Sequence, residues 1–221
     1  MVDKRQPSIQ IVWHQVVVIE RFSSVLYPLD ILELLKQIPT IGYVVPELVL
    51  RGTPEAGKPI ATKGDIELVI NQDSKTIGVR GRDTEKTVAS FQELREFYLE
   101  RLDPSPGLST HYLEFDGQGW AKSQANPLEV YSSFWANHAP LRDLGRFLEA
   151  DTTNFGLQLV PPNKDPNDTD WFHIHIESLV ASSSRRYHIR WTWRSSDIEE
   201  LLKKLSKVDV TLQKLISKIE G

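Results

Sequence analysis

The predicted elements of this 221-residue chain follow one order twice, and this repetition limits the possible folds more than any other feature. Apolar residues at helical spacing follow Pro28, and a similar run follows Pro140 in the second half of the chain. The last helix of each half also matches, with Phe91 of the first corresponding to Ile198 of the second. The two separations are nearly equal, which predicts two copies of one β-α-β-β-β-α unit. The alternative is a chance similarity between two ordinary α+β segments.

The first half predicts three strand regions and two helices. Residues 9–19 predict a long strand whose one face carries Ile9, Ile11, Trp13, Val17 and Ile19. Residues 28–39 predict a helix that buries Leu29, Leu32, Leu35 and Ile38. Residues 43–50 predict an edge strand, because Pro46 has no N–H for a neighbouring strand. Residues 66–70 and 77–79 predict a hairpin with Leu68 opposite Val79 and Glu67 opposite Arg80. Residues 88–102 predict a helix that buries Phe91, Leu94, Tyr98 and Leu102.

The second half repeats these elements and adds one. Strands are expected at residues 112–121 and 155–160, a helix at 140–148 and a hairpin at 171–194. A helix at 196–205 is expected to begin with a serine cap, since acidic residues follow in its first turn. Residues 208–219 are amphipathic and predict a last helix packed on the body, with self-association as the alternative role.

Residues 103–107 read Asp-Pro-Ser-Pro-Gly and interrupt both helix and strand. We therefore expect a first α+β repeat at 1–103, a linker at 104–107, a second repeat at 108–207 and a C-terminal amphipathic helix at 208–221.

An α+β fold follows, in which the duplicated unit forms one mainly antiparallel sheet with four helices packed on one face. This order of elements resembles the saddle architecture of the TATA-binding-protein class. The chain carries no sequence motif of that family, so the resemblance implies an architecture and no activity.

Composition excludes several classes of protein. The absence of cysteine removes disulfides, thiolate metal sites and cysteine nucleophiles, and it favours a cytoplasmic location. A net charge of −4 does not favour a generally basic nucleic-acid binder or a membrane-surface protein. The apolar run at residues 9–19 is too short and too polar to span a bilayer, and it lacks the basic lead and the small-residue cleavage site of a signal peptide. We expect a soluble protein without membrane contact and without a cofactor.

The 171–194 hairpin carries the candidate site. Apolar and polar residues alternate along both of its strands, so Tyr187, Ile189, Trp191 and Trp193 are expected to face the helices. The opposite face then gathers seven candidate ligand-binding residues: His173, His175, Glu177, Arg186, His188, Arg190 and Arg194.

This polar face allows three interpretations. His173 and His175 project to the same side and, with His188, form a candidate metal site, although nearby arginines would repel a dication. The three arginines are candidate contacts for phosphate or nucleic acid, but the hairpin aromatics face the wrong way for base stacking. The third interpretation is a solvated face held by cross-strand pairs. The turn leaves two registers open, with either His175 or Glu177 opposite His188.

No residue set is arranged for catalysis, and no serine lies in a Gly-x-Ser-x-Gly motif. The leading hypothesis is therefore a noncatalytic binding or assembly module that uses an exposed sheet face, with a protein partner or a second copy as the candidate occupant. The alternatives are nucleic-acid or phosphate binding through Arg186, Arg190 and Arg194, and a metal-dependent enzyme built on the two neighbouring histidines of the hairpin.

Overall fold

The structure is a computed structural model, and it describes residues 9–52, 59–102, 108–136, 153–179 and 185–221. This part of the chain forms one antiparallel sheet with the strand order β2-β3-β4-β1-β5-β8-β7-β6. The two longest strands, β1 (Gln10–Phe22) and β5 (Thr110–Lys122), pair at its centre. The remaining strands are β2 (Pro59–Lys63), β3 (Ile66–Asn71), β4 (Thr76–Gly81), β6 (Gly156–Leu159), β7 (Trp171–Ser178) and β8 (Arg186–Ser195).

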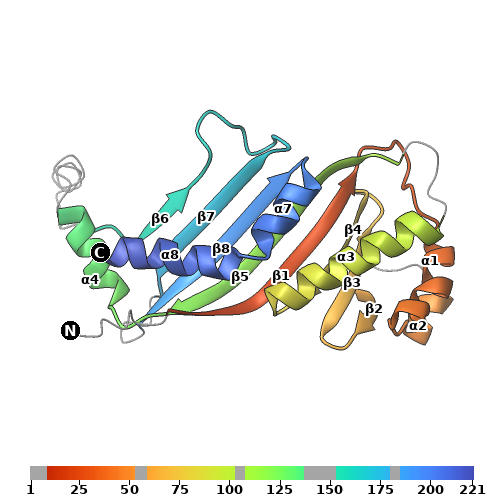
Figure 1. The fold of residues 1–221 in the computed structure, drawn as a ribbon, viewed down its shortest axis with the longest axis horizontal. Coiled ribbons are helices and arrows are strands. Elements are labelled where there is room, and N and C mark those ends of the chain that lie inside the picture. Colours follow the sequence, from red (N-terminus) through yellow and green to blue (C-terminus); the bar gives the residue numbers. More distant parts are fainter. Residues whose placement is uncertain (1–8, 53–58, 103–107, 137–152, 180–184) are drawn as a thin grey trace.

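Helices α3 (Thr84–Arg101), α7 (Ile198–Leu205) and α8 (Val208–Glu220) lie across one face of this sheet (Figure 1). We call the opposite side of the sheet the open face. The other described helices are α1 (Ile31–Gln37), the 3-10 turn η1 (Ile38–Ile41), α2 (Glu47–Arg51) and α4 (Pro127–Ala136). The predicted α+β class and antiparallel sheet are confirmed, and no helix in the described part is long and apolar enough to cross a membrane.

Strand β1 changes phase in its middle. Its pairing with β5 shifts between Trp13 and Gln15, so His14 is an extra residue in a β-bulge. Ile9 and Trp13 are buried before the bulge, whereas Val16, Val18, Glu20 and Phe22 are buried after it. The prediction that Val17 and Ile19 share a face with Trp13 was therefore wrong, because one inserted residue moves every later side chain to the other face.

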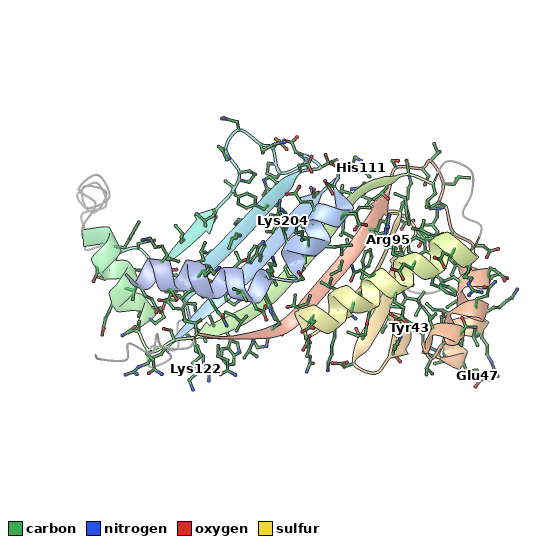
Figure 2. The ribbon with its side chains drawn as sticks, in the orientation of Figure 1. Tyr43, Glu47, Arg95, His111, Lys122 and Lys204 are labelled. Carbon is green, nitrogen blue, oxygen red and sulfur yellow. The ribbon has the colours of Figure 1, made fainter. Side chains whose placement is uncertain are left out.

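The buried side of β1 includes a carboxylate. Glu20 is fully buried, and its oxygens accept hydrogen bonds from Arg95 Nε at 3.1 Å and from the hydroxyls of Tyr98 and Thr110. Arg95 and Tyr98 lie on α3 and Thr110 begins β5, and Figure 2 labels Arg95 beside the central strands. These three donors join the central strand pair to α3.

The segment between β1 and β2 departs most from the prediction. The helix begins after Asp30, whose carboxylate accepts from the backbone N–H of Leu32 at 2.9 Å, and not at Pro28. Leu32 is exposed, while Leu34 takes the buried position. The predicted strand at 43–50 is also wrong. Only Val44 forms a β-bridge, and helix α2 starts directly after Pro46, whose fixed φ suits a helix start.

The hairpin and helix that follow were predicted correctly. Strands β3 and β4 pair with Leu68 opposite Val79 and Glu67 opposite Arg80, and the latter two form an ion pair at 2.6 Å. Helix α3 buries Phe91, Leu94 and Tyr98 as expected and starts somewhat earlier than predicted, since Asp83 caps it.

In the second half, strands β5, β6, β7 and β8 match the expected segments, while the predicted helix at 140–148 and the linker at 104–107 lie outside the described residues. Helix α7 is capped by Asp197 and not by a serine. Ser195 and Ser196 instead donate to Asp170, and the Ser196 backbone N–H lowers the pKa of that carboxyl.

The last helix packs on the body as predicted. Val208, Leu212 and Ile216 are buried on α8, and Asp209 accepts a 2.7 Å hydrogen bond from Trp13 Nε1 on β1. At the other end of the helix, Glu220 accepts from the Tyr187 hydroxyl at 3.0 Å. Both contacts hold α8 on the face opposite the open face.

Candidate functional site

The alternation predicted for the last hairpin is present. Tyr187, Ile189 and Trp191 are buried beneath the helices, and Lys204 of α7 lies 5.0 Å from the Trp193 ring centroid. The seven predicted site residues therefore lie on the open face, because side chains alternate along a strand. Strand pairing sets Glu177 opposite His188 and His175 opposite Arg190, which decides between the two registers that the sequence left open.

The structure divides these seven residues into three groups. The first is a row of polar contacts around Glu177. Its Oε1 lies 2.9 Å from His188 Nδ1, and its Oε2 lies 3.3 Å from His175 Nε2. His173 stacks on His175 with ring centroids 6.1 Å apart, and burial, followed by the nearby His175, lowers the pKa of His173.

This arrangement does not resemble a metal centre. The Glu177 carboxylate already engages two imidazoles, and the described residues contain no group of three His, Cys, Asp or Glu side chains placed to hold a metal ion. The candidate ligands His173, His175 and His188 thus lie near one another without converging on one point.

The second group is centred on Arg194. Its Nε and Nη2 donate to Glu114 Oε2 at 2.8 and 2.5 Å, and its Nη1 donates to the backbone oxygen of Pro166 at 3.0 Å. The guanidinium also lies 4.5 Å from the Tyr112 ring centroid. These contacts use most of its donors, so Arg194 is a structural residue that holds the β6–β7 loop against the sheet.

Arg186 and Arg190 form the third group, in the half of β8 that is further from Arg194. Both are exposed, and neither makes an ion pair with a described residue. Arg186 is opposite Lys122 in the β5–β8 pairing, and its guanidinium lies 4.4 Å from the Trp120 ring centroid. Arg190 is opposite Gln118 on β5.

Sequence reasoning missed the contribution of β5 to this site. Residues directly opposite each other in an antiparallel pair share a face, so Gln118, Trp120 and Lys122 lie on the open face beside the arginines. Figure 2 shows Lys122 at the end of the sheet. The signal was present, since these residues alternate with Gly119 and Ala121, but the pairing of β5 with β8 joins segments that are far apart in the sequence.

We call this part of the open face the basic corner. It comprises Gln118, Trp120, Lys122, His175, Glu177, Arg186, His188 and Arg190. Its central row continues onto Gln158 of β6 and Gln15 of β1. A polar cavity of about 470 Å³ adjoins it at the sheet end and is lined in part by Gln10, Lys122 and Gln213.

Asp116 borders the corner. It lies two residues from Gln118 on the same face, opposite Thr192. Burial raises the pKa of Asp116, the Glu114 carboxylate raises it further, and Arg190 acts in the opposite direction. The negative charge of this residue is therefore held at a cost that Arg190 partly offsets.

A nucleophilic site on the hairpin does not form. Ser195 and His188 are seven residues apart on one strand, which places them about 23 Å from each other at the usual strand rise. The imidazole cannot take a proton from that hydroxyl, and Ser195 is engaged with Asp170 at 3.1 Å.

Comparison with known proteins gives no further guide to the role of this surface: no protein-family model matches the chain, and no match is found among curated proteins or solved structures.

Proposed function

We propose that the protein is a noncatalytic binding module whose binding surface is the open face, and in particular the basic corner. The observation that carries this proposal is an imbalance of contacts. Two acidic groups of the open face are engaged, Glu114 by Arg194 and Glu177 by two histidines, and Asp116 borders the corner near Arg190, whereas Arg186, Arg190 and Lys122 make no ion pair with a described residue. Exposed cations that are in no ion pair can pair with an anionic ligand without first breaking a salt bridge.

A binding role is also supported by the location of the helices. Helices α3, α7 and α8 bury one side of the sheet, so the apolar core does not need the open face (Figure 1). The rigid central strands hold the corner side chains in fixed rows. A surface on paired strands is better defined than one on loops.

We further infer that the two halves are copies of one β-α-β-β-β-α unit, arranged as in the TATA-binding-protein class. The strand order supports this inference because it reads the same from both edges when β1 is matched with β5, β2 with β6, β3 with β7 and β4 with β8. Helices α3 and α7 each follow the last strand of their half. The expected boundaries are 1–103 and 108–207, and the cysteine-free composition supports a cytoplasmic location.

Position-specific photo-cross-linking in cells tests the binding surface. A benzophenone amino acid is placed at Gln118 in the corner or, as the control, at Lys214, which is exposed on α8. We expect a covalent adduct from position 118 and none of that size from position 214. Equal adducts from both positions, or adducts from 214 alone, would contradict the proposal.

A further inference from the structure

Building on the proposed function, we infer that the ligand of the basic corner is a single-stranded nucleic acid. The corner brings together three kinds of group that such a strand requires. These are cations for phosphates, an aromatic ring for a base, and side-chain amides for base edges. Their proximity comes from the pairing of β5 and β8.

The cations are spaced along the sheet. Arg186 and Lys122 are directly opposite each other on neighbouring strands, which makes one doubly charged position at the sheet end. Arg190 lies four residues further along β8, about 13 Å away at the usual strand rise. One phosphate can contact the Arg186–Lys122 pair while another phosphate of the same strand contacts Arg190, and arginine adds bidentate geometry.

Trp120 supplies the stacking surface. It lies on the open face between His188 of β8 and Val12 of β1, it is only partly buried, and its ring carries the Arg186 guanidinium. A base can stack on that guanidinium plane or replace it over the indole. The aromatics of β8 face the helices as expected, whereas Trp120 on β5 lies on the open face.

Amides from three strands continue the surface. Gln158, Gln118 and Gln15 lie in one row of opposing residues with His175 and Arg190. Each amide offers both donors and an acceptor, which suits the mixed edges of unpaired bases. A duplex would present its phosphates but could not place a base over Trp120, so the corner favours single strands.

The acidic residues nearby do not cancel this charge. The Glu177 carboxylate is held between two imidazoles, and Asp116 lies beyond the corner, where Arg190 partly offsets the cost of its charge. Three cations outnumber the two carboxylates Glu177 and Asp116, which leaves a local positive potential on a chain whose net charge is −4.

Fluorescence anisotropy with defined probes tests the inference. The probes are a 15-nucleotide oligo-dT, the matching oligo-rU and a 15-base-pair duplex, each labelled with fluorescein and titrated between 50 and 200 mM salt. We expect both single strands to bind more tightly than the duplex. The double variant Arg186→Gln/Arg190→Gln should reduce the slope of log affinity against log salt by about 1.4, from two lost single-strand phosphate contacts.

Two further variants separate this surface from general charge. Lys203→Gln/Lys214→Gln makes the same charge change on exposed lysines of α7 and α8 and should leave the salt slope unchanged. Trp120→Ala should weaken binding by about 5- to 150-fold through lost stacking. Trp120→Phe keeps an aromatic ring and should weaken binding less than Trp120→Ala. Circular dichroism confirms that each variant is folded.

Three results would overturn the inference. They are no binding of either single strand, tighter binding of the duplex than of the single strands, or an equal reduction of the salt slope in the arginine and lysine double variants. If the oligonucleotides do not bind but position 118 still gives its specific adduct, the ligand is of another class and the open face remains the binding surface. If position 118 also gives no specific adduct, the proposed function fails as well.

Discussion

Replacement of Glu20 by alanine should destabilise this protein more than most single substitutions. The side chain is fully buried and accepts from Arg95, Tyr98 and Thr110, so alanine leaves all three donors without their acceptor. Removing one member of a buried charge pair costs about 3–5 kcal/mol. That cost is a large fraction of the roughly 5–15 kcal/mol that stabilises a typical domain.

A double-mutant cycle can separate the contribution of the Tyr98 hydrogen bond from the total cost of Glu20→Ala. Tyr98→Phe removes one hydrogen bond to a charged group and should cost about 1.5–3 kcal/mol. Because both residues contribute to one network, the Glu20→Ala/Tyr98→Phe double variant should cost less than the sum of the two single variants. The matched control is Glu93→Gln. Its ion pair with Lys63 at 2.5 Å is partly exposed and should contribute less than about 1 kcal/mol.

Urea unfolding, followed by both tryptophan fluorescence and far-ultraviolet circular dichroism, measures these differences. Coincident transitions are needed before a two-state free energy is assigned. In thermal unfolding, Glu20→Ala should lower Tm by roughly 6–20 °C for a chain of this size. A cost below about 1 kcal/mol with an unchanged denaturant slope, similar to that of Glu93→Gln, would refute the view that a buried carboxylate joins α3 to the central strands.

Three other predictions concern backbone packing and ionisation. Gly78→Ala should lower the free energy of unfolding in urea by about 1–3 kcal/mol, because an added Cβ would meet the Val18 carbonyl and the Ile19 side chain. Gly52→Ala is the control and should be tolerated, since the nearest atom to its added Cβ is 3.7 Å away. Equal costs would contradict that packing. Asp116→Asn should raise the urea midpoint at pH 7, because burial raises the pKa of the native carboxyl and makes its charged form costly. This gain in stability should shrink towards pH 3.5, where the carboxyl becomes protonated. A gain that does not depend on pH would argue against this cause. Stability should also fall as the pH rises above 10, because unfolded tyrosines ionise near that value while burial raises the pKa of five folded ones, Tyr27, Tyr43, Tyr98, Tyr131 and Tyr187. Absorbance at 295 nm should follow loss of the circular dichroism signal, and ionisation of these five side chains within an intact fold below pH 11 would contradict the prediction.

Elements with strong local periodicity could be predicted from the sequence. The β7–β8 hairpin has clean alternation, and helix α3 has a regular apolar stripe, so both were identified with their buried faces. The β3–β4 register was also predictable, since the short connection leaves few ways to pair Leu68 with Val79. In each case the information lies within a single helix or a single hairpin.

The errors have non-local causes. The bulge at His14 depends on how β1 fits β5, and these strands are far apart along the chain. Glu20 lies at a position where polarity predicts exposure, and only the three donors brought by α3 and β5 make its burial favourable. Local propensity does not contain these contacts.

The candidate site was half predictable. Alternation placed Arg186, His188 and Arg190 on one face, as the structure has them. It could not show that Glu114 and the β6–β7 loop engage Arg194, nor that Trp120 and Lys122 lie beside the other two arginines. Both facts depend on which strands become neighbours, and that choice is made by the whole sheet.

Thiol footprinting can decide whether the open face is occupied inside the cell. The chain has no cysteine, so Gln118→Cys and Lys214→Cys each introduce a single reactive thiol. The ratio of their labelling rates by N-ethylmaleimide is compared between intact cells and purified protein. If a ligand occupies the corner nine-tenths of the time, the labelling rate at position 118 in cells should fall about tenfold relative to the rate at position 214. An unchanged ratio would contradict the assignment of the open face as the binding surface.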